Sequence, residues 1–232
     1  MIRRLALVVT VVVACAASGG VATARTTDHE VARAGVLLLS DFPAGWTERT
    51  RGQTTQTDLD TAAASVRACK PFVAFSKANE KYPRARSHDF EEGNSDVTSA
   101  VSVYPSAVKA SGSLQLFADR RVPTCFDRLF TTVFRAQLAK QRKVANQVTS
   151  IRTDVQPVTG VRIGDEAVVY QGRVDVALKG GTSETIGLGF VAVRVDDALA
   201  RYSYTADTDI SSALQPAIVA SVSRLQHAQS GA

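Results

Sequence analysis

The feature of this sequence that most restricts its fold is a succession of segments in which apolar side chains repeat with the period of a β-strand. Strict alternation of apolar and polar residues is typical of a strand with one face in a core, and a continuous apolar run of strand length is typical of a central strand. The predicted strands of this kind are residues 149–155, 168–179, 185–195 and 199–206. Gly180-Gly181 and Asp196-Asp197 separate consecutive strands as short turns, so the sequence predicts an antiparallel sheet in this half of the chain.

The rest of the chain combines helical segments with one further hairpin. The predicted helices are residues 30–39, 58–73, 106–120, 123–143 and 210–225. Pro71 is expected to kink or split the second of these helices, and Pro216 to kink the last. Residues 84–91 and 97–104 predict a β-hairpin with Gly93-Asn94 at its turn. Helices and antiparallel hairpins segregated in this way imply an α+β fold, a single domain whose helices pack mainly on one face of an antiparallel sheet.

The first 24 residues have the three parts of a secretory signal peptide. Arg3 and Arg4 precede an apolar run over residues 5–17, and small residues follow up to Ala24. A run of 13 residues is roughly 20 Å long as a helix, shorter than the ~30 Å hydrocarbon core of a bilayer. We therefore expect an extracytoplasmic protein. The expected organisation is a signal peptide at 1–24, a flexible tether at 25–30 and a folded domain at 31–228.

Two processing routes fit this segment. Ala22-Thr23-Ala24 satisfies the small-x-small rule of an ordinary signal peptidase, which gives a freely secreted chain. Val12-Val13-Ala14-Cys15 resembles a bacterial lipobox, in which the cysteine becomes the lipid-bearing first residue and anchors the chain to the outer face of the cytoplasmic membrane. An uncleaved anchor is a third route, because no charged residue lies between Arg4 and Arg25.

Setting Cys15 aside leaves Cys69 and Cys125 as one pair of cysteines. Exported proteins mature in an oxidising compartment, so this pair predicts a structural disulfide. In the chain-entropy model, a closed loop of about 57 residues stabilises a fold by roughly 4 kcal/mol. A redox or metal role is the alternative, although no Cys-x-x-Cys pattern and no neighbouring histidine supports it.

Two short motifs match catalytic patterns by their letters alone. Ser87-His88-Asp89 has the residue types of a hydrolytic triad, yet neighbouring residues on a strand point to opposite faces. Residues 187–192 match the dinucleotide-binding pattern Gly-x-Gly-x-x-Ala, but they lie within a predicted strand and not at a strand-to-helix turn. We interpret the first motif as an incidental strand edge, and the second as small residues that let a helix pack closely on the sheet.

The titratable residues give little support to an enzyme. The chain has 3 histidines, and its acidic pairs lack the glycine and glutamate spacing of a calcium loop. We therefore expect no catalytic residue, no metal site and no cofactor. A carboxylate pair that the fold brings together, as in a secreted glycoside hydrolase, is the alternative that the sequence leaves open.

Positive charge recurs along the predicted helix 123–143. Arg128, Arg135 and Arg142 are spaced by seven residues and share one stripe of that helix. The stripe is either a solvated face or a contact for anionic headgroups, polymers or an acidic partner. The chain has 27 basic and 22 acidic residues, a balance too close to neutral to predict nucleic-acid binding. Four aromatic residues are candidates either for a pocket or for the core: Trp46, Tyr170, Tyr202 and Tyr204.

Five motifs, spread over most of the predicted domain, resemble a known family. They are Leu37-Leu38-Leu39-Ser40-Asp41-Phe42-Pro43-Ala44-Gly45-Trp46, Cys69 within a helix, Arg86-Ser87-His88-Asp89-Phe90, Pro123-Thr124-Cys125 and Gly164-Asp165. Together they resemble the actinobacterial envelope sensor-domain family, which includes lipoproteins and the extracellular domains of PknH-like receptor Ser/Thr kinases. The resemblance implies an α+β module that senses or binds a ligand and carries no catalytic motif.

The expected function is therefore that of an exported, non-catalytic, envelope-associated domain that binds a small or envelope-derived ligand or a protein partner. The expected partners are an envelope ligand or protein and an anionic surface, and attachment to the membrane is expected only through a lipid anchor on Cys15. A secreted hydrolase with a carboxylate pair and a lipid-anchored structural or adaptor protein are the alternatives. A pocket with converging carboxylates of raised pKa favours the hydrolase, and an apolar pocket without them favours the binding domain.

Overall fold

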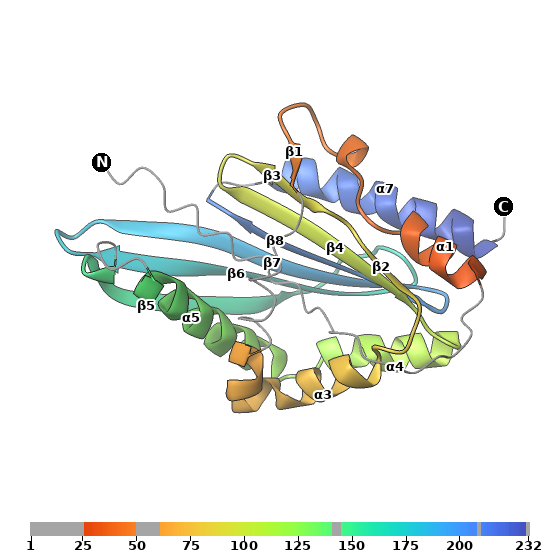
Figure 1. The fold of residues 1–232 in the computed structure, drawn as a ribbon, viewed down its shortest axis with the longest axis horizontal. Helices are drawn as coiled ribbons and strands as arrows, with labels where there is room; N and C mark the ends of the chain where they lie inside the picture. The colour runs from red at the N-terminus through yellow and green to blue at the C-terminus, as the bar shows by residue number, and fades with distance from the viewer. Residues whose placement is uncertain (1–25, 50–60, 141–144, 208–209, 231–232) are drawn as a thin grey trace.

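The computed structural model describes residues 26–49, 61–140, 145–207 and 210–230 (Figure 1). The helical elements are α1 (Thr26–Ala34), η1 (Leu39–Asp41), η2 (Arg67–Cys69), α3 (Lys70–Ala78), α4 (Ala107–Phe117), α5 (Val122–Lys140) and α7 (Ser211–Ser230). The strands are β1 (Thr47–Arg49), β2 (Arg84–Arg86), β3 (Asp89–Glu92), β4 (Ser95–Val103), β5 (Val148–Val158), β6 (Glu166–Leu178), β7 (Ser183–Val195) and β8 (Ala198–Ala206). The expected signal peptide at 1–24, with Cys15, lies outside the described residues.

The strands form one antiparallel sheet in the order β1-β3-β4-β8-β7-β6-β5, and β2 pairs with β4. β6, β7 and β8 are consecutive in the chain and adjacent in the sheet, as the alternating segments predict. Gly180, Gly181 and Asp196 adopt positive φ in the turns between them, a conformation that glycine reaches without strain. The predicted α+β class and the antiparallel sheet are confirmed.

The strand predicted over 84–91 is interrupted in its middle. β2 and β3 pair with the same edge of β4, but the register shifts between them. Ser87 occupies the break: its N–H donates to the Ser99 carbonyl at 3.0 Å, and its hydroxyl accepts from the Ser99 N–H at 2.9 Å. The Ser87 hydroxyl thus takes the place of one backbone acceptor in the hydrogen-bond ladder. The alternation of apolar and polar residues does not reveal such an interruption.

Helices cover both faces of the sheet, where the sequence predicts helices mainly on one. α3, α4 and α5 lie on one side, and α1 and α7 lie on the other (Figure 1). Each side has its own apolar core, the first around Phe126 and Leu188 and the second around Tyr202 and Leu225. The reason lies in β7 and β8, whose residues are buried toward both cores and therefore require cover on both faces.

The predicted disulfide between Cys69 and Cys125 is confirmed. It joins η2 to the first turn of α5, and both cysteines are buried. α3 begins at Lys70, so Pro71 lies in its first turn, where the missing N–H leaves no hydrogen bond unmade. The described part of the helix predicted over 58–73 is consequently divided at η2.

α1 begins within the segment expected to be a tether, and earlier than the helix predicted over 30–39. It ends before Gly35, where a Cβ atom would lie 2.9 Å from a Leu225 methyl carbon of α7. Glycine at this position therefore allows the end of α1 to approach α7 closely. Among the described helices, none is long and apolar enough to cross a bilayer.

Removal of the disulfide tests how far the fold depends on it. We expect the double variant Cys69→Ser, Cys125→Ser to lose about 2–4 kcal/mol of unfolding free energy in urea, because the open chain gains entropy in the unfolded state. In the presence of a reductant that opens the disulfide of the wild type, the two proteins should have the same unfolding free energy. Peptide mapping that recovers two free thiols from oxidised, folded protein would contradict the pairing.

Candidate functional site

A groove of about 740 Å³ lies on the α7 side of the sheet. The first half of α7 forms one wall, the connection from β5 to β6 contributes a second, and β6, β7 and β8 form the floor. In Figure 1, β5, β6 and β7 extend to the left beyond the end of α7, so that the described helices of this side leave part of the sheet uncovered. The groove lies where that cover ends.

Apolar side chains form much of the groove's lining. Val169 of β6 contributes to the floor, and Leu214 and Ile218 of α7 contribute to the wall. Val161 in the β5–β6 connection and Val219 on α7 also line the groove and expose 42% and 51% of their surface. Exposed apolar residues beside an apolar cavity are surface that a ligand with an apolar body would cover.

Tyr204 of β8 shapes the floor of the groove. Its partner in the register is Gly189 of β7, and a Cβ atom at that position would overlap the Tyr204 ring. The ring therefore occupies the space of the missing side chain and lies along the sheet. The Gly-rich motif at 187–192 serves this packing, so the neighbour that the small residue admits is an aromatic ring and not the predicted helix.

Polar and charged residues complete the lining, among them Arg162, Gln171, Thr185, Asp207 and Gln215. The hydroxyl of Thr185 donates to the Asp175 carboxylate at 2.7 Å, and the Asp207 carboxylate accepts from the Asn94 amide at 2.6 Å. Asp207 is the one carboxylate in the described lining. These groups can orient the polar end of a ligand, but they do not supply a paired general acid and base.

The triad-like motif does not form a site. The Nε2 atom of the exposed His88 lies 3.4 Å from the Glu48 carboxylate, while Ser87 and Asp89 are buried. Their side chains therefore face different surroundings. In the part of the chain that the structure describes, no group of three His, Cys, Asp or Glu residues is placed to hold a metal ion.

Asp127 lies on α5, on the side of the sheet opposite α7, and interacts electrostatically with Asp154 of β5. Burial raises the pKa of Asp127, the charge of Asp154 raises it further, and a hydrogen bond from the Val155 backbone opposes the rise. The Oδ1 atom of Asp127 is buried without a hydrogen-bond partner in the structure. Neither carboxylate belongs to the lining of the groove, so the perturbed pair and the cavity do not coincide.

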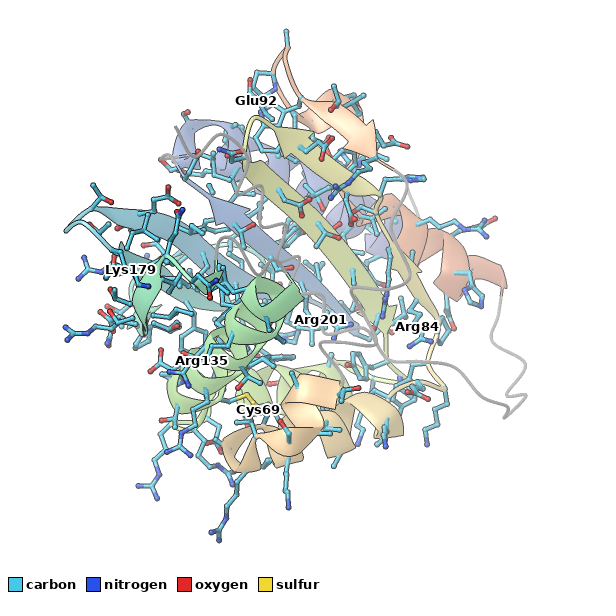
Figure 2. The ribbon with its side chains drawn as sticks, turned by 60° about the vertical axis from the view of Figure 1, so that its left-hand side comes forward. Cys69, Arg84, Glu92, Arg135, Lys179 and Arg201 are labelled. Carbon is cyan, nitrogen blue, oxygen red and sulfur yellow. A yellow bond between two sulfur atoms is a disulfide. The ribbon has the colours of Figure 1, made fainter. Side chains whose placement is uncertain are left out.

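Arg128 and Arg135 are exposed on α5, and Arg142 lies outside the described residues (Figure 2). α5 packs on the side of the sheet opposite α7. Arg128 and Arg135 are therefore separated from the groove by the thickness of the sheet.

The four aromatic candidates lie in different parts of the structure. Tyr204 lines the groove, whereas Trp46 and Tyr202 are buried in the core beside α7. Tyr170 contributes to the groove from β6, but its hydroxyl donates to the Phe117 carbonyl at 2.8 Å on the α4 side. One of the four therefore presents its ring to the candidate site.

Two of the motifs that carry the family resemblance have structural roles. Asp41 accepts hydrogen bonds from two nitrogens of Arg224 on α7, at 2.6 and 2.8 Å, and Arg224 also donates to the Ala34 carbonyl at the end of α1. Gly164 has a φ of +61° and lies so close to the Arg194 backbone that a side chain would overlap it. Asp41 and Arg224 therefore connect α7 to the end of α1, and Gly164 lets the chain pass close to β7 before β6 begins.

The groove is not evident from the sequence. Val169 and Gln171 lie on the face of β6 that the alternation marks as wet, and this face was the available signal. An aromatic residue opposite glycine in two adjacent predicted strands was the second signal. Neither signal indicates a binding site until the position of α7 over the sheet is known.

No family model matches this chain, and no curated protein matches it. Among solved structures, the chain is similar to the extracellular domain of PknH from Mycobacterium tuberculosis, with 15% sequence identity and a TM-score of 0.45. The match covers 84% of this chain and 96% of that chain. At this identity and TM-score, the likeness establishes neither a shared fold nor a shared function.

A methyl group at residue 189 tests the floor of the groove. We expect Gly189→Ala to lose about 1–3 kcal/mol of unfolding free energy, because the new Cβ must displace the Tyr204 ring. In a Tyr204→Ala background the same glycine substitution should cost far less, because the ring is absent. Gly187→Ala is the matched control, since its Cβ would lie 3.3 Å from the nearest backbone oxygen. Urea unfolding measures the wild type and the four variants, and a Gly189→Ala variant as stable as the wild type would contradict the packing.

The pKa of Asp127 predicts a pH-dependent effect of Asp127→Asn. A carboxyl group whose folded-state pKa is raised stabilises the fold below its unfolded pKa, and this contribution is lost as the pH rises through the folded pKa. At neutral pH the amide removes the charge beside Asp154 and still accepts from Val155. We therefore expect the variant to be more stable than the wild type at pH 7, with the difference shrinking as the pH falls through the raised folded-state pKa and levelling off below about pH 4. A difference in unfolding free energy that stays constant with pH would refute this assignment.

Proposed function

We propose that the chain is an exported, non-catalytic domain that binds a small ligand with an apolar body and a polar end in the groove beside α7. The observation that carries this proposal is the groove itself, an apolar depression of about 740 Å³. This volume lies within the range of small-molecule sites, which combine apolar walls with a few polar groups. Arg162, Gln171 and Gln215 are the polar groups that would orient such a ligand.

The charge of the lining favours binding over hydrolysis. A hydrolase that uses a carboxylate pair needs two carboxyl groups facing one substrate, at least one of them with an adjusted pKa. The described lining has Asp207 alone, and the perturbed Asp127 lies on the other side of the sheet. The groove therefore has the chemistry of a binding site.

The proposed export rests on the first 24 residues and on the disulfide. A secretory signal pattern precedes α1, and the bond between Cys69 and Cys125 is of the kind that persists in an oxidising compartment. A lipid-bearing Cys15 would hold the domain at the envelope, and cleavage after Ala24 would release it. The described groove is the same in either form.

A thermal-shift screen tests ligand binding. The chain starting at Arg25 would be heated with 8-anilinonaphthalene-1-sulfonate, with fatty acids of increasing length and with isoprenoid alcohols. A ligand at about 100 times its dissociation constant adds about 2.7 kcal/mol, so the melting temperature should rise by about 5 °C or more. If no probe changes the melting temperature, the proposal is wrong.

A variant that fills the groove locates the binding. Val169→Trp places a large ring on the floor, and we expect the ligand-induced shift in melting temperature to disappear. Val108→Trp is the control, because Val108 exposes 84% of its surface on α4, on the other side of the sheet. An undiminished shift in Val169→Trp would place the ligand elsewhere.

A further inference from the structure

The layer of helices opposite the groove holds an excess of positive charge. Residues 61–81 and 106–140 include η2, α3, α4 and α5, and they contain ten Lys and Arg against three Asp and Glu, a formal net charge of +7. The rest of the chain contains 17 basic and 19 acidic residues. The positive charge of the protein is therefore concentrated in one layer.

The cations of this layer face solvent. Every Lys and Arg of the two segments whose side chain is described is exposed, whereas Glu80, Asp119 and Asp127 are half-buried. Asp119 is also paired with Arg121 at 2.7 Å. Six of the exposed cations lie within η2, α3, α4 and α5 themselves and form no salt bridge with any other residue that the structure describes. We call them the basic helical face: Arg67, Lys70, Lys77, Lys109, Arg128 and Arg135.

The disulfide holds this face together. Figure 2 shows Cys69 at the point where η2 meets α5, with Arg135 farther along the same helix. Side chains tipped with nitrogen project from these helices away from the sheet. Because Cys69 and Cys125 fix η2 to α5, the cations of two helical elements remain part of one surface.

An apolar depression lies between α3 and α4 beside these cations. It measures about 380 Å³ and is lined by Phe75, Val108 and Leu116 together with Lys109. Val108 exposes 84% of its surface, more than any other large apolar side chain in the described part of the protein. An apolar side chain that stands in solvent among cations is unfavourable in water and favourable at the boundary between lipid headgroups and acyl chains.

We propose that the basic helical face docks the protein on an anionic lipid bilayer, with Val108 entering the headgroup region. Lys and Arg suit this contact because their long stems lie along apolar surface while their charged ends reach the phosphates. Each such charge near an anionic surface strengthens binding about fivefold. This inference does not depend on the proposed ligand in the groove, which lies on the other side of the sheet.

Vesicle co-sedimentation tests the charge. Every described helix and strand lies within residues 26–230, so the chain starting at Arg25 contains the whole described fold without its apolar leader. We expect this chain to bind vesicles rich in phosphatidylglycerol at low salt and to dissociate from them as the salt concentration rises. It should not bind phosphatidylcholine vesicles. Absence of binding to the anionic vesicles at low salt would overturn the proposal.

Two matched triple variants separate this face from net charge. Lys77→Glu, Lys109→Glu and Arg128→Glu should weaken vesicle binding about 100-fold or more, because three attractive contacts become repulsive. Arg33→Glu, Arg152→Glu and Lys179→Glu change the net charge equally at exposed positions outside the layer, and should weaken binding far less. Circular dichroism checks that both variants are folded. Equal losses in the two variants would show that the net charge acts without any particular face, and would refute the docking surface.

Val108→Ser separates a bilayer from a soluble polyanion. The substitution is at an exposed position and leaves the charge unchanged, so we expect vesicle binding to weaken about fivefold and binding to dextran sulfate to stay the same. If Val108→Ser binds vesicles as tightly as the wild type, the face recognises anionic charge alone and the bilayer proposal is wrong.

Discussion

The structure depends on burial of both faces of its central strands. Ala192 and Leu199 are fully buried in the core beside α4 and α5, and Val193 and Ala200 are fully buried in the core beside α1 and α7. Apolar surface on both faces of one sheet requires a helical layer on each side. The two layers cover different strands, because α4 and α5 contact strands from β5 to β8, whereas α1 and α7 contact β2, β4, β7 and β8. The groove lies on the part of the α7 side that α1 and α7 leave open.

Much of the fold follows from local pattern, and the site does not. The period of two over residues 168–179 and the short turns after it predict β6, β7 and β8, and the two cysteines predict the disulfide, because each signal lies in the residues concerned. Helices on both faces were not predicted, although the continuous apolar run within residues 185–195 already indicates a strand buried on both faces. The groove requires the register that sets Tyr204 against Gly189 and the position of α7 above them, and both are long-range results of packing.

The two surfaces proposed to bind ligands lie on opposite sides of the sheet. With the basic helical face on a bilayer, the groove opens away from the lipid. A ligand would then enter the groove from the side that faces away from the bilayer. Its apolar part would be shielded by α7 and β6, and its polar part would stay in contact with water. The disulfide stabilises the layer of α3, α4 and α5, whereas the ion pair of Asp41 and Arg224 connects α7, one wall of the groove, to the segment after α1.

The most direct test of the central claim is an NMR titration of the chain starting at Arg25, labelled with ¹⁵N, with 8-anilinonaphthalene-1-sulfonate. The account predicts saturable chemical-shift changes in the backbone amides of β6 around Val169, of β7 around Thr185 and of the first half of α7, with α3 and α5 unchanged. Shift changes confined to α3, α4 and α5, or no saturable change, would contradict the assignment of the groove as the binding site.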